Sequence, residues 1–257
     1  MLPVYVVSLT RDIYRREKIA SAMNDLDIGF TFSDAIDARD PQNTLRIESC
    51  RNTGGHTDIM TNGEIACSLS HQEVYDKIIA EGHEWAIVLE DDVSVDRQFR
   101  HFIDNFVPDI ADKLSPKNMY LLGGMKGLHS HPTIAVSMFN YLSVGTIKLR
   151  RVTRNQKKVR RACCYLIHKT MCKEIQNWTR LKGLHRADSW KEMHYAGVIS
   201  HFYYSEFISH PIVTRENSNL ESERDSQSTQ CGERTSFNRT LKYARSLIRL
   251  APFYLMR

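Results

Sequence analysis

The sequence predicts an α/β fold in which helices cover a mixed, mostly parallel sheet. A β-rich run over residues 4–9 begins almost at once and is followed by a helical pattern. Residues 86–93 are apolar through Leu89 and then carry three consecutive acids, as expected of a strand buried on both faces that ends at a polar edge. Strands and helices that alternate in this way are typical of α/β proteins.

The composition is that of an ordinary globular protein. The chain has 257 residues, 42% of them hydrophobic and 25% charged, which is enough for one large domain or one domain with an appendage. The net charge of +5 comes from basic and acidic residues mixed along most of the chain, so we expect no nucleic acid partner.

The cysteines and the N-terminal stretch indicate a cytoplasmic protein. The six cysteines show neither zinc-finger spacing nor a secreted disulfide framework, which favours a reducing compartment. The first residues lack the basic leader of a signal peptide, and no segment approaches the length of a membrane span.

The first half is predicted to open as a nucleotide-binding unit. A strand at 30–32 follows the first helix, and Asp37 lies just beyond it, where an acid commonly reaches a ribose or a base. Asp37 could equally be a loop acid in solvent. The glycine fingerprint of dinucleotide-binding folds is missing from the first turn, which disfavours that class.

A helix is predicted to lead into the acidic strand. Residues 40–62 look irregular, and the helix is expected from about residue 64 to residue 81, with Gly82 as its C-terminal stop. His71 falls on the same side of this helix as several apolar residues.

The three acids after Leu89 are candidates for a metal site. Carboxylates that crowd at a strand end repel one another unless a cation shares their charge, and Mg²⁺ or Mn²⁺ is the natural partner of carboxylates and phosphates. Successive side chains on a strand point to opposite faces, so Glu90 and Asp92 are expected on one side and Asp91 on the other. The alternative is an exposed acidic turn.

The second half carries further alternating elements. Its basic segment 126–158 contains no acid and is either an insertion that faces an acceptor or, as we favour, a surface hairpin. The other predicted elements are helices over 96–112 and 170–181 and strands over 119–124, 160–167 and 202–207.

The C-terminal region has its own pattern. Residues 215–234 are polar and are predicted to form a linker. Residues 237–257 alternate apolar and basic positions at helical spacing. Such a helix can lie on an anionic membrane, here the cytoplasmic face of a bacterial inner membrane, or it can dock on its own domain.

Several segments occur in an order and spacing that point to a family. They are Ala35-Ile36-Asp37, Asn62-Gly63-Glu64-Ile65-Ala66-Cys67, Leu69-Ser70-His71 and Leu89-Glu90-Asp91-Asp92-Val93. Together they resemble glycosyltransferase family 25, the lipooligosaccharide galactosyltransferase family of Gram-negative bacteria. The late strand departs from the family pattern, which usually has a glycine before the apolar run where this chain has Arg161.

The resemblance implies a GT-A type, single Rossmann-like domain over residues 1–214. Residues 1–124 would be the nucleotide-sugar and metal half and residues 125–214 the acceptor half, followed by 215–257. It also implies an inverting transferase that uses Mn²⁺ or Mg²⁺ and moves a hexose, expected to be galactose from UDP-galactose, onto a lipooligosaccharide or related bacterial glycan. A metal that bridges both phosphates neutralises the charge of the departing diphosphate.

In this light the chain offers a specific set of candidate site residues. Asp188 is the expected general base, because it lies in a polar loop beside Trp190, although it could instead cap a helix. The expected metal ligands are Glu90, Asp91 and Asp92 with His210, or alternatively His201. The expected donor contacts are Ser8, Leu9, Arg11, Asp37, Asn62, Gly63, Glu64, Ser70 and His71, and the expected acceptor contacts are Gly123, Gly124 and Trp190.

Two other function classes remain open. Clustered acids also serve metal-dependent phosphohydrolases, although the first half supplies no further array of histidines or aspartates at strand ends. A non-catalytic nucleotide-sugar or carbohydrate-binding protein is the second alternative.

Overall fold

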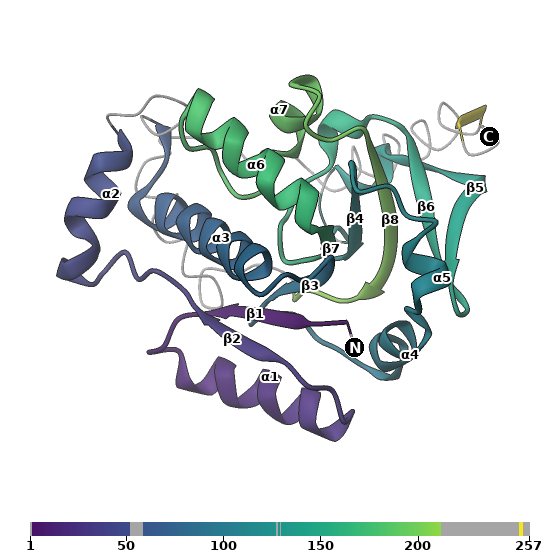
Figure 1. Cartoon of the computed structure of the whole chain (residues 1–257), viewed down its shortest axis with the longest axis horizontal. Helices are drawn as coiled ribbons and strands as arrows, with labels where there is room; N and C mark the ends of the chain where they lie inside the picture. The colour runs from purple at the N-terminus through teal and green to yellow at the C-terminus, as the bar shows by residue number, and fades with distance from the viewer. Residues whose placement is uncertain (1, 52–58, 127, 129, 212–251, 254–257) are drawn as a thin grey trace, which may run out of the picture.

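Figure 1 shows a computed structural model of the chain, which describes residues 2–51, 59–126, 128, 130–211 and 252–253. Short 3-10 turns accompany the main elements at η1 (Pro41–Asn43), η3 (His131–Thr133) and η4 (Gln156–Lys158). The helices and strands are, in chain order, β1 (Val4–Ser8), α1 (Ile13–Asp25), β2 (Thr31–Asp34), α2 (Thr44–Arg51), α3 (Asn62–Ala80), β3 (Trp85–Glu90), α4 (Arg97–Asn105), α5 (Pro108–Ala111), β4 (Asn118–Gly123), β5 (Ala135–Val144), β6 (Ile147–Arg154), β7 (Cys164–His168), α6 (Lys169–Lys182), α7 (Trp190–Tyr195) and β8 (His201–Ile208).

The described strands form one eight-stranded sheet with the order β2-β1-β3-β7-β4-β8-β6-β5. The predicted α/β class and the mixed sheet are confirmed. Only three of the seven neighbouring pairs are parallel, namely β1–β2, β1–β3 and β4–β8, so the expectation of mostly parallel pairing is wrong. The reason is that β7 returns antiparallel between β3 and β4, and the β5–β6 hairpin extends one edge beside β8.

Helices cover both faces of the sheet, as Figure 1 shows. On one face Ala86 and Val88 of β3 pack in a core with side chains of α3, α6 and α7. On the other face Ile87 and Leu89 pack with side chains of α1 and α4. A strand that is covered on both sides needs no polar face, which explains its continuous apolar run. Glu90 is next in the alternation and therefore faces α3.

Helix α3 begins with a capping box that fixes its first turn. Thr61 Oγ1 accepts the Glu64 amide at 3.1 Å, and Glu64 Oε2 accepts the Thr61 amide at 3.1 Å. The helix starts at Asn62, two residues before the predicted position. The preceding stretch, predicted to be irregular, contains helix α2, which buries only Ile47. One buried position gives no periodicity that could reveal a helix.

The predicted helix over 96–112 is two helices. Asp96 caps α4 by accepting the Gln98 amide at 2.8 Å, and α4 ends at Asn105. Pro108 then opens α5 at its first position. Proline has no amide proton and disfavours helical backbone in the residue before it, so it starts a new helix instead of continuing the old one.

The basic segment forms the predicted hairpin, whose strand β6 pairs with β8. The polar stretch 215–234 lies outside the described residues, and so does most of the predicted amphipathic tail. Its described residue Phe253 contacts β6: Thr153 Oγ1 donates to the Phe253 carbonyl at 2.7 Å, and the Arg154 guanidinium lies 4.6 Å from the Phe253 ring. Among the described residues, no helix is both long enough and apolar enough to cross a membrane.

The close approach of the β4 and β8 backbones at Gly123 predicts that a side chain at this position destabilises the protein. A Cβ on Gly123 would lie 1.9 Å from the Ile208 carbonyl oxygen, whereas a Cβ on Gly29 would have nothing within 4 Å. We expect Gly123→Ala to lower the free energy of unfolding by about 1–3 kcal/mol or more, because the backbone of β8 must move away. Gly29→Ala should change it by less than about 0.5 kcal/mol. Urea unfolding of both variants tests this, and equal effects would contradict the close strand contact.

Candidate functional site

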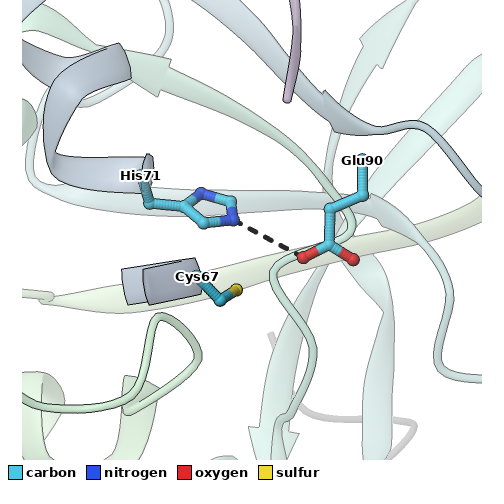
Figure 2. Close-up of side chains that lie close together, drawn as sticks. All are labelled: Cys67, His71 and Glu90. Carbon is cyan, nitrogen blue, oxygen red and sulfur yellow. Dashed lines mark ion pairs between the residues drawn. The ribbon is translucent and has the colours of Figure 1, made fainter. Parts of the chain in front are cut away.

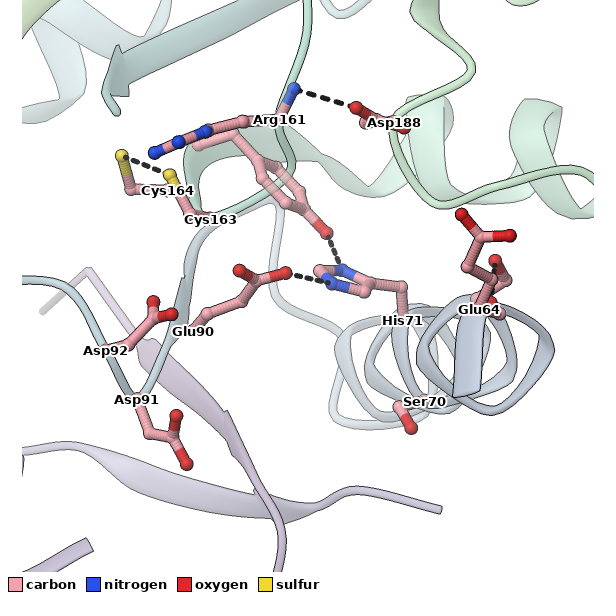
Figure 3. A network of polar contacts seen from close by, with 12 residues as sticks. Glu64, Ser70, His71, Glu90, Asp91, Asp92, Arg161, Cys163, Cys164 and Asp188 are labelled. Atoms are coloured by element: carbon pink, nitrogen blue, oxygen red, sulfur yellow. Dashed lines mark hydrogen bonds and ion pairs between the residues drawn. The ribbon is translucent and has the colours of Figure 1, made fainter. Parts of the chain in front are cut away.

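Three carboxylates stand at the carboxyl end of β3, beside the carboxyl end of the parallel strand β1. Glu90 pairs in register with Val7, and Asp91 and Asp92 follow directly. Figure 3 shows that Asp91 points away from Glu90 and that Glu90 extends toward His71 on α3. The predicted division of the three acids between two sides is confirmed.

Asp91 is held inside the protein by two neighbours. Ser8 Oγ donates to Asp91 Oδ2 at 2.6 Å, and Arg15 Nη1 lies 3.3 Å from Asp91 Oδ1. Burial raises the pKa of Asp91 to about 6, although the Ser8 hydrogen bond and the Arg15 charge act in the opposite direction. These contacts tie the end of β3 to β1 and α1. The structure therefore does not bring Asp91 into the group of possible metal ligands.

Glu90, Asp92 and His210 form that group. Each offers one ligand atom, and the three atoms lie within 4.8 Å of one another. His210 follows β8, and its Nε2 lies 3.2 Å from Asp92 Oδ1. The alternative ligand His201 lies at the opposite end of β8, within 3.2 Å of Arg151 Nη2, so that expectation is wrong.

The electrostatics of this group suit a cation. Burial alone would raise the pKa of Asp92, but His210, Arg15 and Arg161 together lower it, so the carboxylate is held in its charged form. Burial alone would lower the pKa of His210, but the contact with Asp92 raises it overall. Asp92 Oδ1 is buried and receives no well-aligned hydrogen bond within the part of the chain that the structure describes, although His210 faces it as an ion pair.

The chemistry of these donors fits a divalent ion such as Mn²⁺ or Mg²⁺. Two carboxylates and one imidazole are ligands that Mn²⁺ accepts readily, and Mg²⁺ favours the oxygens. His210 Nδ1 lies 2.6 Å from the Pro211 carbonyl oxygen, to which its proton can be donated. A hydrogen bond of this kind orients the other ring nitrogen toward a metal. Glu90, Asp92 and His210 are thus the residues that would hold the ion.

Several expected donor contacts instead have internal structural roles. Ser70 is fully buried, where its Oγ donates to the Ala66 carbonyl at 2.7 Å and accepts the Ile36 amide at 2.8 Å. Glu64, the capping residue of α3, is also buried, and its Oε1 lies 2.8 Å from Arg186 Nε. Their hydrogen-bonding groups serve the fold in this structure.

Other expected donor contacts are more accessible. Arg11 and Asp37, at the ends of β1 and β2, form an ion pair at 2.8 Å and leave 34% and 21% of their side chains exposed. The Leu9 carbonyl accepts the Asp12 amide at 3.0 Å. Asn62 Oδ1 accepts from Arg51 Nη2 at 2.6 Å, and Gly63 lies in the first turn of α3.

Arg161 is a residue of this region whose role the sequence did not reveal. Its φ of 69° lies in the left-handed region, where a glycine is favoured. Two side chains hold this backbone: Asp188 Oδ2 accepts the Arg161 amide at 3.0 Å, and Trp190 Nε1 donates to the Arg161 carbonyl at 3.0 Å. A glycine at this position, as in the family pattern, would adopt such a φ without strain. The guanidinium extends on the side of the carboxylate cluster (Figure 3), and its charge acts on both Asp92 and His210.

The three residues predicted to contact the acceptor, Gly123, Gly124 and Trp190, are all packed against protein in this structure. Trp190 has no exposed surface and packs edge-on against Tyr165, so its ring has no face for a sugar in this structure and that expectation is wrong. The space in front of the two glycines is filled by protein, namely Ile208 for Gly123 and Cys163 for Gly124. Close packing of the chain therefore accounts for both glycines.

The hydrogen bond from the Arg161 amide to Asp188 predicts how substitutions of Asp188 affect stability. Asp188→Ala removes the acceptor of the Arg161 amide and should lower the free energy of unfolding by about 1–3 kcal/mol. Asp188→Asn retains an oxygen acceptor and should stay within about 1 kcal/mol of the wild type. Urea unfolding measures both, with Ala at the exposed Asp112 as a control. A loss in Asp188→Asn as large as in Asp188→Ala would contradict a role as simple acceptor.

Comparisons with known proteins bear on the assignment of this site. "Probable inactive glycosyltransferase 25 family member 3" of Rattus norvegicus is 31% identical over 144 residues, which are 52% of this chain and 24% of that protein. "Procollagen galactosyltransferase 1" of Danio rerio is 23% identical over 127 residues, which are 47% of this chain and 21% of that protein. The chain thus spans about a quarter of the length of these curated relatives.

A solved structure and a family match complete the comparison. The crystal structure of a glycosyltransferase involved in glycosylation of the major capsid of PBCV-1 aligns with 88% of this chain and 98% of its own, at 10% identity and a TM-score of 0.40, which is too low to support an argument. Residues 1–190 match the family described as "Glycosyltransferase family 25 (LPS biosynthesis protein)". Because this match covers most of the chain and includes the β3 carboxylates, the protein belongs to glycosyltransferase family 25.

Proposed function

We propose that this protein is a metal-dependent, inverting hexosyltransferase of the GT-A type. The observation that carries the proposal is the Glu90, Asp92 and His210 group at the carboxyl end of β3, in a chain that belongs to a glycosyltransferase family. In open α/β sheets, ligands bind at this edge. A nucleotide-sugar donor brings a diphosphate that can complete the coordination of an ion held by these residues.

Charge balance supports a diphosphate ligand here. The ligand atoms of Glu90 and Asp92 lie within 4.8 Å of each other, a separation at which two negative charges repel by about 3 kcal/mol at an effective dielectric of about 20. When bound, the ion would neutralise this charge and that of the departing diphosphate. Arg15 and Arg161 supply further positive charge near Asp92, which favours an anionic group at this edge.

The neighbouring strand ends offer a place for the nucleoside. Arg11 and Asp37 leave parts of their side chains exposed at the carboxyl ends of β1 and β2. An acid beyond the second strand commonly contacts a ribose or base, and Asp37 has that position. In this proposal Arg11 orients Asp37 for the contact, while Ser8 acts through Asp91 to fix the strand end.

Inversion requires a base that takes the proton of the acceptor hydroxyl as it attacks C1 of the sugar. We assign this role to Asp188. One of its carboxylate oxygens accepts the Arg161 amide, and the other oxygen would receive the proton. The hydrogen bond to the backbone would fix the direction of the second oxygen.

The expected donor is UDP-galactose and the expected acceptor a lipooligosaccharide or a related bacterial surface glycan. Some curated relatives carry the name procollagen galactosyltransferase, which supports galactose, and the family description refers to LPS biosynthesis, which supports the acceptor class. An acceptor of this kind would place the protein at the cytoplasmic face of the inner membrane, where the basic stretch 237–257 could contact anionic lipid.

A second candidate function is donor binding without turnover. It is favoured by relatives from Rattus norvegicus, Mus musculus and Homo sapiens whose names include the word inactive. Incubation with radiolabelled UDP-galactose and a lipooligosaccharide acceptor separates the functions. Labelled glycan indicates transfer, label that binds without product indicates a binding protein, and phosphate released without labelled glycan indicates a phosphohydrolase.

The metal assignment predicts the effect of Asp92→Asn. Wild-type protein should bind UDP more tightly with Mn²⁺ than with EDTA. In the variant the ratio of these two affinities should be at least tenfold smaller, because one charged ligand is gone. Isothermal titration calorimetry measures this, with exposed Asp104→Asn as the matched control. If Asp92→Asn keeps both transfer and its dependence on Mn²⁺, the metal assignment is wrong.

The base assignment predicts a different pattern for Asp188→Asn. The amide can still accept the Arg161 amide proton, but it cannot take a proton from the acceptor. We expect kcat to fall by about 100-fold or more, with the affinity for UDP unchanged. Transfer kinetics together with UDP titration check this. An unchanged kcat would leave Asp188 as a purely structural residue.

A further inference from the structure

We propose that Cys67, His71 and Glu90 form a second metal site, suited to a thiophilic divalent ion such as Zn²⁺. The site lies between α3 and the end of β3, and it shares Glu90 with the group that contains Asp92 and His210. The proposal rests on the geometry of these three residues and does not depend on the transferase function.

The backbone brings the three side chains together. Cys67 and His71 are four residues apart on α3, so they project from one face of that helix. Glu90 reaches the same space from β3. One ligand atom from each residue lies within 4.8 Å of the other two, and Figure 2 shows the imidazole, the sulfur and the carboxylate turned toward a common centre. His71 Nε2 is 3.5 Å from Glu90 Oε1. Two ligands of a tetrahedral Zn²⁺ with bonds of about 2 Å stand roughly 3.3 Å apart.

The hydrogen bonds around His71 leave its ligating nitrogen available. Tyr165 donates its only hydroxyl proton to Tyr75 at 3.1 Å, so the His71 Nδ1 proton is donated to Tyr165 at 2.7 Å. Neutral His71 then carries a lone pair on Nε2. This atom is buried, has no hydrogen-bond partner among the described residues, and faces the Glu90 carboxylate. A lone pair held against a carboxylate is unfavourable without a cation between them.

Histidine ligands of metals commonly have their other ring nitrogen fixed in this way. His210 has the same arrangement in the neighbouring group, where Nδ1 meets the Pro211 carbonyl and Nε2 faces Asp92. The two histidines thus reach neighbouring carboxylates from different elements, His71 from α3 and His210 from the segment after β8. His71 is 1% exposed, so the orientation of its ring is set by the core around it.

The donor set selects the ion. A thiolate, an imidazole and a carboxylate are ligands of zinc sites, and three protein ligands leave one tetrahedral position open. The group with Asp92 offers two carboxylates and one imidazole, which is harder and favours Mn²⁺ or Mg²⁺. The thiol of Cys67 must lose its proton to solvent when the ion binds, and no other reactant is required.

Co²⁺ is the probe for this site, because a cobalt–thiolate bond gives a charge-transfer absorption that carboxylate and imidazole ligands do not give. The full chain, reduced and freed of metal with a chelator that is then removed, is titrated with CoCl₂ and afterwards with ZnCl₂. We expect a saturable thiolate charge-transfer band and visible absorption typical of four-coordinate cobalt, both abolished by Zn²⁺. Cys67→Ser should lose the band and weaken Zn²⁺ binding at least tenfold.

Two control variants separate this site from its surroundings. Cys50→Ser removes another half-buried thiol and should keep the band. Asp92→Asn disrupts the neighbouring group and should also keep it, whereas His71→Gln should reduce Zn²⁺ affinity as Cys67→Ser does. The proposal is overturned if wild-type protein gives no thiolate band, if the band survives in Cys67→Ser, or if Asp92→Asn rather than Cys67→Ser removes it. These outcomes require no transferase activity.

Discussion

The structure depends on how one strand end distributes three negative charges. The pleat of β3 sends Asp91 toward Ser8 and Arg15, where hydrogen bonds tie the strand to β1 and α1. It sends Glu90 and Asp92 to the other side, where histidines meet them. Asp91 thus ties the strand end to its neighbours, and Glu90 and Asp92 remain available as ligands. If all three acids lay on one side of the strand, repulsion between their negative charges would destabilise the end of the strand.

The strained residue Arg161 serves the same edge. A left-handed arginine costs about 1–2 kcal/mol relative to ordinary backbone, and such strain persists only when the surroundings hold it. Asp188, which precedes α7, and Trp190, the first residue of α7, hold the Arg161 backbone by hydrogen bonds. In return, the arginine side chain brings a positive charge near Asp92 and His210, which a glycine at this position would lack. The departure from the family pattern is therefore also a change in the electrostatics of the site.

Much of the fold follows from local sequence, whereas the site follows only in part. The apolar run of β3, the helix that precedes it and the pleat alternation of Glu90 and Asp92 are local properties, and the sequence predicts them. Helix α2 was not predictable, because it buries one side chain. Nor was the burial of Trp190, because an aromatic residue in a polar loop has the same local pattern whether it packs inward or faces solvent. The distance from His71 to Glu90 depends on how α3 packs on β3, and spacing in sequence does not encode that.

Glu90 belongs to both groups of possible metal ligands, so binding at one group would affect the other. A carboxylate has two oxygens, so it can bridge two ions or serve one of them fully. Cys67 and His71 belong to α3, whereas Asp92 follows β3 and His210 follows β8. An ion bound on the α3 side would draw electron density from the carboxylate and would weaken its interaction with an ion on the other side. If both groups bind ions, occupancy of one would therefore change the affinity of the other, and by thermodynamic linkage the effect would be reciprocal.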